Sequence, residues 1–444
     1  MIKRLIIVFA VLSFIFLGTA FSAVENIKVS GDMNNEVFTR DLTLGGADYT
    51  TGLKQKADES LFSQIRLRFD ADLSEGVSAV LRLISEEGWG ERGTSNNLKV
   101  DLGYVEMKEF LYQPLTVIIG KQELHYGNGM IVGNTDTNQG KITGSAVATN
   151  LPNIVSDLSL LKSFDAVRAI LDFSPWTLDF VFAQVDEGNT NDRRDDEMLL
   201  GFNAAYSLGS HGEVAELYFF SGDNTPQAIS TDAKDKVYVT GARTLLNLSE
   251  KITVGIEGAY QFGDYRESAS IHRHIAAWAG QFISEYRFLN AYNAKVGLDF
   301  SYFSGDKSNI SRYEAWNPMW EDQSPAELMN TLLSMSNRKV IGLSASMMPR
   351  EDVTLKLRYA RGWLDKKFTT ALINPAIGPA SGYVYYVEQS KKHLGDEIDL
   401  YALYDYTEDV QFKVSGAWLV PGTVFSSRND NLAYSVRAGV NVEF

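Results

Sequence analysis

Hydrophobic and polar residues alternate along much of this chain, and the pattern is clearest at its C-terminal end. In residues 431–444 (NLAYSVRAGVNVEF), every second residue from Tyr434 to Phe444 is apolar or aromatic, and polar residues or glycine lie between them. A two-residue period predicts a β-strand with one apolar and one polar face. Such a strand suits a wall between lipid and water, where its free edge must pair with another strand of the chain. We therefore expect the last strand to pair with the first and to close a barrel.

Eighteen segments of this kind follow one another, and the gaps between them are alternately long and short. The short gaps are turn-like, as at 74–75 and 174–175, whereas the long gaps span 45–60, 123–162, 304–338 and 363–393. If the chain starts in the periplasm, every short turn lies there and every long loop lies outside, as in outer-membrane barrels. The segments are 24–30 with an extension as far as 44, 61–73, 77–87, 98–109, 115–122, 163–173, 176–185, 197–208, 212–221, 235–248, 251–263, 273–288, 292–303, 339–349, 352–362, 394–407, 409–420 and 431–444.

The pattern as a whole predicts an all-β fold: a transmembrane antiparallel up-and-down β-barrel of about 18 strands, with long extracellular loops and short periplasmic turns. The composition supports this fold, because 36 Gly, 21 Tyr and 24 Phe suit the strands and aromatic girdles of a barrel. A secreted protein built of stacked β-sheets is the alternative, because soluble sandwiches also alternate.

The N-terminal residues 1–23 read as a secretory signal peptide. Lys3 and Arg4 precede an apolar run from residue 5 to 17, and small residues follow up to Ala23. The run is shorter than the ~20 residues that a membrane-spanning helix needs, so later membrane contact must be made by strands. We expect cleavage after Ala20 or Ala23, a barrel formed by residues 24–444, and a location in the bacterial outer membrane, in contact with its lipid.

Charge and cysteine content exclude several classes of function. The chain carries 41 basic and 56 acidic residues, and removal of Lys3 and Arg4 leaves a net charge of −17, which argues against a nucleic-acid partner. The absence of cysteine excludes a disulfide framework, a lipoprotein anchor and a thiolate metal site.

Positive charge recurs on the face of the strands that the apolar pattern assigns to the lumen. Arg243 and Lys121 have a less regular period, and we place them inside because a charge facing lipid at mid-depth costs roughly 2–4 kcal/mol. Arg66 and Arg68 are expected to flank Arg82 diagonally on the neighbouring strand. The predicted inward bases, near the middle of the wall, are Arg66, Arg68, Arg82, Lys121, Arg168, Arg243, Lys356, Arg358, Lys413 and Arg437.

We call these ten predicted inward bases the basic belt, and two interpretations of it remain open. Rings of Arg and Lys favour anions, so the belt predicts an anion-selective passage. Acids at Glu216, Glu257, Asp299 and Asp399 fall at the same level, and part of the charge will pair with them. The belt would then be an ordinary wet barrel interior with balanced charges.

Residues 324–336 (SPAELMNTLLSMS) predict a short helix within a long loop. Ser324 suits an N-cap, Pro325 the first helical position and Glu327 the third, and apolar residues follow at helical spacing. The helix either folds over or into the mouth of the barrel or, as we favour, lies on its surface.

Two stretches resemble the alginate-export family of outer-membrane channels. They are residues 120–134 (GKQELHYGNGMIVGN) and 393–406 (HLGDEIDLYALYDY), with Pro421 and Gly422 after the next strand. The resemblance implies an eighteen-stranded monomeric barrel with a lumen rich in Arg and Lys, through which an acidic polysaccharide passes and which loops gate. Lys121 stands where the family motif carries Arg, so the charge is kept. The other bases come from strand parity and not from the motif.

Catalytic signatures are missing from the sequence, which contains no HExxH, GxSxG or phosphate-binding glycine loop followed by a helix. His272 and His274 read as a surface pair, since two ligands are a weak metal signal. We predict a channel for an anionic polysaccharide or a comparable anionic solute, not an enzyme, without cofactor or metal. The alternatives are a general porin and a loop-plugged surface or adhesin barrel. The aromatic Phe444 also resembles the terminal signature that the barrel-insertion machinery reads.

Overall fold

The computed structural model describes most of the chain. The signal peptide expected at 1–23 and the proposed caps Ser324 and Pro325 lie outside the described residues. Among the residues that are described, no helix combines the length and the apolar character needed to cross a membrane. The described ranges are 26–46, 58–90, 98–135, 157–186, 197–224, 235–266, 272–307, 311–323, 326–373 and 384–444.

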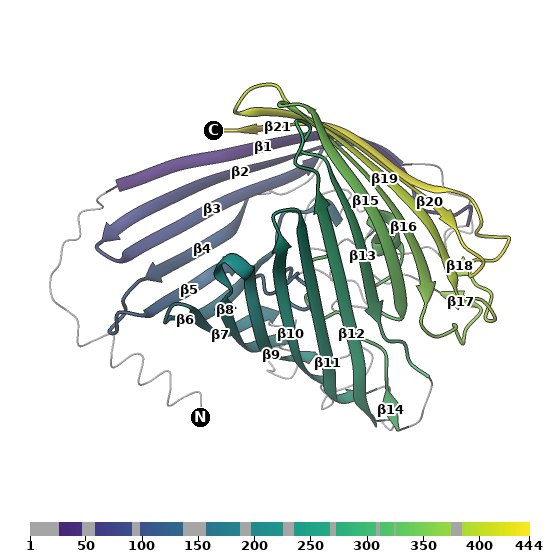
Figure 1. Cartoon of the computed structure of the whole chain (residues 1–444), viewed down its shortest axis with the longest axis horizontal. Helices are drawn as coiled ribbons and strands as arrows, with labels where there is room; N and C mark the ends of the chain where they lie inside the picture. The colour runs from purple at the N-terminus through teal and green to yellow at the C-terminus, as the bar shows by residue number, and fades with distance from the viewer. Residues whose placement is uncertain are drawn as a thin grey trace.

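In the part of the chain that the structure describes, eighteen long strands form a closed antiparallel barrel. Figure 1 shows how the strands follow one another around its wall. Each pairs with its neighbours along the chain, and β1 pairs with β21. The predicted fold class, strand number and closure are therefore confirmed. The barrel strands are β1 (Asn26–Asp41), β2 (Asp58–Ser74), β3 (Val77–Gly88), β4 (Lys99–Met107), β5 (Leu115–Glu123), β6 (Ser163–Asp172), β7 (Trp176–Asp186), β8 (Glu197–Ser207), β9 (Gly212–Asn224), β10 (Asp235–Ser249), β11 (Ile252–Arg266), β12 (His272–Arg287), β13 (Lys295–Phe303), β15 (Arg338–Arg350), β16 (Val353–Leu364), β19 (His393–Asp405), β20 (Val410–Pro421) and β21 (Ala433–Glu443).

The remaining elements are short and lie at the two ends of the barrel or within it. The two-residue strand β14 (Arg312–Tyr313) pairs in parallel with the start of β12, and β17 (Leu372–Ile373) pairs with β18 (Tyr385–Tyr386). The 3-10 helix η2 (Gly209–His211) forms the turn between β8 and β9, and α2 (Glu327–Leu332) belongs to the long connection between β13 and β15.

The seam between the first and last strands is closed by hydrogen bonds at the chain terminus. The Gly31 amide donates to the Phe444 carbonyl at 2.8 Å, and the Phe444 amide donates to the Gly31 carbonyl at 3.0 Å. A Cβ at Gly31 would lie 2.7 Å from the Phe444 ring and 2.6 Å from the Arg66 carbonyl. Position 31 therefore admits only glycine without movement of the seam.

The outer face of the wall is apolar and carries an aromatic girdle. Phe219, Tyr238, Phe262, Tyr260 and Trp278 form a continuous series of ring contacts across β9 to β12, with centroids 4.4–6.2 Å apart. Amphipathic rings favour the interface between lipid and water. The series lies toward the ends of these strands that adjoin the long loops.

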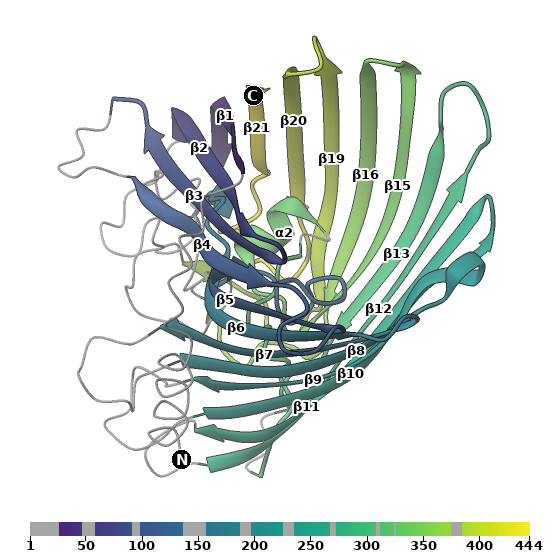
Figure 2. The same ribbon diagram turned by 90° about the vertical axis from the view of Figure 1, so that its left-hand side faces the viewer.

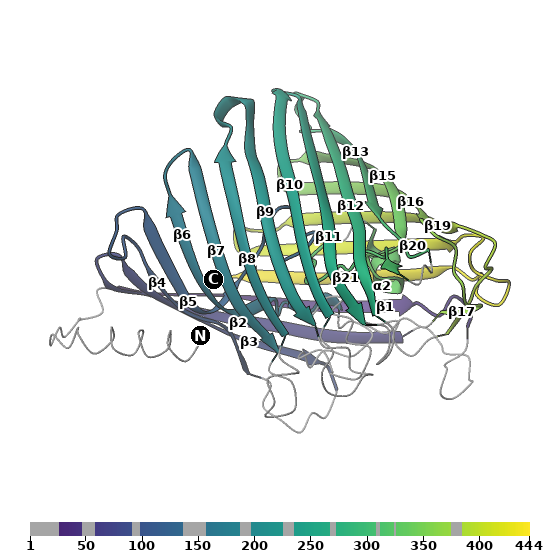
Figure 3. The same ribbon diagram turned by 90° about the horizontal axis from the view of Figure 1, so that it is seen from below.

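Helix α2 lies inside the barrel, as Figures 2 and 3 show. Leu328, Met329 and Leu332 are at most 2% exposed and pack in one cluster with inward side chains of β15 to β21, such as Val340 and Ala417. The alternative favoured from the sequence, a surface helix, was wrong. The reason is that the apolar side of the helix finds an apolar patch on the inner wall at the extracellular end.

A second apolar cluster fills the other side of the extracellular end. Met130 and Val132, from the β5–β6 connection, and Trp316 and Trp320, from the β13–β15 connection, are at most 2% exposed. They pack against inward side chains of β6 to β13, such as Phe220. The described parts of both long connections therefore fold back into the barrel and narrow its lumen.

Candidate functional site

Nine of the ten predicted lumen bases project from the inner face of the wall. On β2, for example, Arg66 and Arg68 share the face of the buried Phe62 and Gln64, while Leu61 on the opposite face is 41% exposed. The same comparison along the other strands places these nine inside: Arg66, Arg68, Arg82, Arg168, Arg243, Lys356, Arg358, Lys413 and Arg437.

Lys121 lies on the outer face, so its predicted inward position was wrong. In the β5–β6 ladder Lys121 is directly opposite Asp165, next to the exposed Val167, whereas Gln122 is opposite the buried Phe164. The Lys121 ammonium pairs with the Asp165 carboxylate at 3.0 Å. This partner and the position near the end of β5 remove the lipid penalty on which the prediction relied.

The first group of bases lies on β2 and β3, each with a carboxylate beside it. Arg68 is directly opposite Arg82, and only Arg66 is diagonal, so the predicted arrangement was half right. Arg66 pairs with Asp32 at 2.9 Å, Arg68 with Asp70 at 2.7 Å, and Arg82 with Asp101 at 2.5 Å. Arg82 also pairs with Glu123, the last residue of β5.

A second group of bases pairs with acids on other strands: Arg168 and Arg243 with acids of the adjacent strand, and Arg358 with an acid across the intervening strand β15. Arg168 pairs with Asp179 of β7. Arg243 pairs with Glu216 of β9 at 2.6 Å. Arg358 makes two hydrogen bonds to Asp299 of β13, at 2.6 and 2.9 Å.

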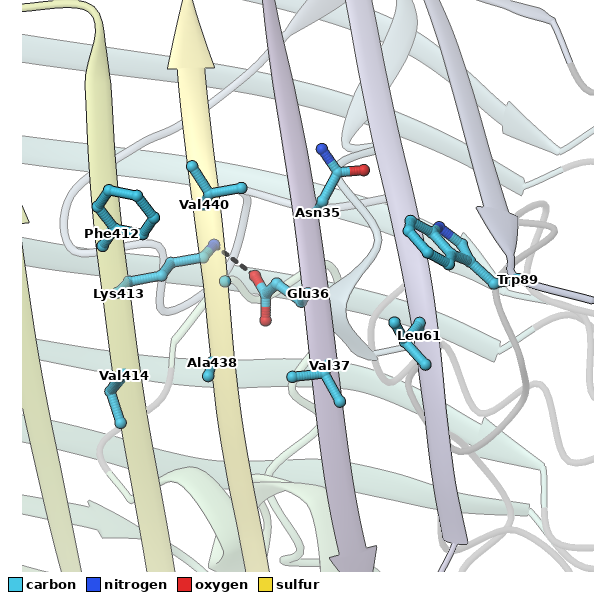
Figure 4. Close-up of a pocket in the computed structure, with 11 residues that line it drawn as sticks. Asn35, Glu36, Val37, Leu61, Trp89, Phe412, Lys413, Val414, Ala438 and Val440 are labelled. Carbon is cyan, nitrogen blue, oxygen red and sulfur yellow. Dashed lines mark ion pairs between the residues drawn. The ribbon is translucent and has the colours of Figure 1, made fainter.

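These pairs continue around the barrel to the seam. Lys413 of β20 and Glu36 of β1 form an ion pair that spans β21 at Gly439, which is the residue opposite both in the ladders (Figure 4). A Cβ at Gly439 would lie 2.7 Å from Glu36 Cγ, so the bridge requires a glycine there. Outer-face side chains of the same strands, such as Phe412 and Val440, line a shallow apolar pocket.

Arg437 and Lys356 are the last two of the nine inward bases. Arg437 donates to Glu327 of α2 at 3.2 Å, and Tyr401 of β19 donates to the same carboxylate at 3.0 Å, so the wall holds the helix by charge. Lys356 is exposed and makes no ion pair with any described residue.

Several residues that narrow the lumen were not predicted. Arg40 is 1% exposed and pairs with Asp157, from the β5–β6 connection, at 2.8 Å. Arg243 Nε donates to the Asn128 side chain at 3.1 Å, and the Asn128 amide donates to Glu257 at 3.2 Å. The alternation of β1 could have placed Arg40 inside. No periodic signal could have placed Asn128 there, because it lies in an irregular segment.

The exposure of each pair shows which charge faces the water of the lumen. Arg66 is 26% exposed and its partner Asp32 is 19% exposed. The corresponding values are 23% for Arg168 and 7% for Asp179, and 32% for Lys413 and 5% for Glu36. The base is also at least as exposed as its nearest acid for Arg68, Arg243, Arg358 and Arg437. Arg82 is the exception: it is 11% exposed, whereas its nearest acid, Glu123, is 49% exposed.

The two neighbouring histidines share a carboxylate that the sequence did not reveal. His272 Nε2 and His274 Nδ1 each lie 3.1 Å from Asp264 Oδ1 at the exposed end of β11 and β12. In the described part of the chain, no group of three or more His, Cys, Asp or Glu side chains is placed to hold a metal ion.

Comparisons with solved structures show the same barrel over nearly the whole chain. A BenF-like porin from Pseudomonas fluorescens Pf-5 matches with a TM-score of 0.55 and 11% identity, over 95% of this chain and 99% of that one. OccK3 (OpdO) from Pseudomonas aeruginosa matches with a TM-score of 0.56 and 12% identity, over 95% and 97%. OccAB1 from Acinetobacter baumannii matches with a TM-score of 0.56 and 9% identity, over 97% and 99%. At these identities the likeness shows the fold alone.

No curated protein sequence matches the chain. The model of the family described as alginate export matches residues 85–440. Together with the closed barrel, this match places the protein in the bacterial outer membrane as a channel. Because the match extends over most of the sequence, the chain belongs to the alginate export family.

Proposed function

We propose that the channel carries an anionic polysaccharide, or a comparably charged solute, past the inward-facing arginines and lysines. The observation that carries this proposal is the exposure of the ion pairs. For seven of these eight bases, the base is at least as exposed as its nearest acid, and Arg82 beside Glu123 is the exception. A passing solute therefore meets guanidinium and ammonium groups before it meets carboxylates.

The chemistry of arginine makes such pairs useful even though they are neutral overall. A guanidinium group has five N–H donors, and one carboxylate engages only some of them. The remaining donors of Arg66 or Arg168 are free to bind a carboxylate or sulfate of the solute. These donors would replace the water that the anionic groups of the solute lose in the lumen. Because each of these arginines is paired with an acid, the net field would stay too weak to hold the solute there.

The narrowed extracellular end supports a passage for an extended chain rather than a wide pore. Helix α2 covers the inner wall at β15 to β21, and the segment around Met130 covers it at β6 to β13. An eighteen-stranded wall without such segments would leave a broad aqueous bore. The same segments would exclude bulky or branched solutes.

A general porin without polymer selectivity is the second candidate. The observation that favours it is that eight of the nine inward bases have an acid partner, so these bases bring little excess positive charge to the lumen. Lys356 is the exception.

Block of the channel current separates the two candidates. Purified protein in a planar bilayer is exposed to uronate oligomers on one side and, separately, to neutral glucose oligomers of the same length. The first proposal predicts block by the uronate oligomers at concentrations at least tenfold lower. Equal block by both would favour the general porin, and no current at all would favour a plugged surface barrel.

We also propose that the barrel-insertion machinery recognises the C-terminal strand through Phe444. This side chain is 64% exposed and follows the last residue of β21, at the seam that must close last. An accessible terminal ring is available to a partner before closure and remains so afterwards.

A further inference from the structure

A row of aromatic and basic side chains crosses the outer face of the barrel at the extracellular ends of four strands. In the ladders, Tyr302 of β13 is directly opposite Lys339 of β15, Lys339 is opposite Trp363 of β16, and Trp363 is opposite His393 of β19. Phe300, two residues before Tyr302, is 40% exposed on the same face. Long connections follow β13 and β16, so this row lies at the outer leaflet of the membrane.

Two cations lie against the rings of this row. Lys339 Nζ is 5.3 Å from the centroid of the Tyr302 ring, and the Arg361 guanidinium is 5.6 Å from that of Trp363. Lys339 and Arg361 occupy diagonal positions on β15 and β16, a spacing of about 7–8 Å between backbones. Their side chains are 39% and 44% exposed. Rings at the membrane interface thus hold two accessible positive charges at one depth.

The acids near this row leave its positive charge in excess. Asp365, whose side chain is 5% exposed, is shared by Lys339 at 3.0 Å and Lys366 at 2.8 Å. Arg361 meets Asp396 at 3.6 Å, which is longer than a hydrogen bond and leaves guanidinium donors available. Three bases therefore face two acids, one of them buried, on a protein whose net charge is −15.

We propose that Lys339, Arg361 and Lys366 form a binding site for the phosphate groups of lipid A, the phosphorylated glycolipid of the outer leaflet. The aromatic rings set the depth of the site at the border of the hydrocarbon region, which is where these phosphates lie. Arg binds phosphate through two parallel N–H donors, and Lys adds a point charge. Basic clusters at this border bind anionic lipid head groups in the same way.

The site concerns the outer face of the wall and is independent of what passes through the lumen. Its function would be to order the lipid next to the β13–β19 side of the barrel. It also uses side chains that the proposed passage of anions does not.

Native mass spectrometry of the full-length protein in detergent tests this site. The protein is titrated with diphosphorylated lipid A and, separately, with lipid A from which both phosphates have been removed. We expect K339Q/R361Q to bind the phosphorylated form about tenfold more weakly than wild type, a loss of about 1.4 kcal/mol. The matched control is K121Q, which removes a lysine from the outer face of β5, on another side of the barrel.

Three results would overturn the site: equal affinity of K339Q/R361Q and wild type, equal affinity for lipid A with and without phosphates, or binding of phosphatidylglycerol as tight as that of lipid A. Folding of each variant is checked by its mobility on gels before and after heating. If the double variant does not fold, R361Q alone should weaken binding about threefold, and an unchanged affinity would again reject the site.

Discussion

Arg68 of β2 and Arg82 of β3 lie directly opposite each other on the inner face of the barrel, although both carry a positive charge. Like charges in this position are unfavourable unless anions lie beside them. Asp70 meets Arg68 at 2.7 Å and Asp101 meets Arg82 at 2.5 Å. The wall thus supplies the anions that permit two guanidinium groups to face the lumen side by side.

The two acids should differ in their effect on stability. Asp101 is fully buried, so D101N breaks its ion pair with Arg82 where water cannot replace the lost partner. We expect the free energy of unfolding to fall by about 3 kcal/mol. Asp70 and Arg68 are both 34% exposed, so D70N should cost about 0.5 kcal/mol. Urea unfolding in lipid vesicles measures both. Equal losses of unfolding free energy in the two variants would contradict the conclusion that the buried Asp101 stabilises the barrel more than Asp70 does.

Glu397 should control the position of α2. Its carboxylate, from the inner face of β19, accepts hydrogen bonds from the amides of Leu328 at 2.6 Å and Met329 at 2.8 Å. Bonds to a charged group contribute about 1.5–3 kcal/mol, so E397Q should increase the population of released helix at least tenfold. Faster proteolysis between residues 323 and 338 and a larger single-channel conductance are the expected results.

The neighbouring residue of β19 supplies the control for this variant. Asp396 lies on the outer face and does not reach α2, so D396N should leave both proteolysis and conductance unchanged. Equal effects of E397Q and D396N would show that the loss of charge on β19, and not the release of α2, is responsible.

Asp365 should make stability depend on pH only in the acid range. Burial alone would raise the pKa of Asp365, but hydrogen bonds from Lys366, Lys339 and the Gly305 amide outweigh it and hold the pKa below its ordinary value. A depressed pKa contributes stability that is complete above the ordinary carboxyl pKa and is lost as pH falls through the depressed one.

Thermal unfolding of wild type and D365N at a series of pH values measures this contribution. The difference between the two proteins should be constant from neutral pH down to the ordinary carboxyl range and should shrink below it. A difference that grows as pH falls would mean that the pKa is raised instead.

Closure of the barrel should depend on Gly31. A Cβ at this position meets the Phe444 ring and the Arg66 carbonyl at less than 3 Å, whereas a Cβ at Gly258 on β11 meets no atom within 4 Å. We therefore expect G31A to lower the yield of folded barrel severalfold and G258A to leave it unchanged. Heat-modifiable mobility on gels measures the folded fraction, and equal yields would show that the seam tolerates a side chain.

The sequence predicted the wall well because a membrane imposes a strict rule on it. Each strand must turn an apolar face to lipid, so parity alone placed Arg66, Arg168 and Lys413 inside. The prediction for Lys121 was wrong because it relied on the cost of a charge in lipid. That cost applies at mid-depth, whereas Lys121 lies near the end of β5 and next to Asp165.

The contents of the lumen were much harder to predict. The partners of the bases, such as Asp179 for Arg168, come from other strands, and pairing register is not visible in a period of two. The inward fold of α2 depends on Glu397 and on an apolar patch assembled from five strands. Such contacts arise only when the barrel is closed.

The reversal potential across a planar bilayer under a potassium chloride gradient tests the central claim most directly. Wild type should prefer anions, and R66Q/R68Q/R82Q, which removes three bases and keeps their acids, should shift the potential toward that of a cation-selective pore. R361Q, which removes an arginine from the outer face, should not shift it. An unchanged potential in the triple variant would contradict the account that solutes meet these bases in the lumen.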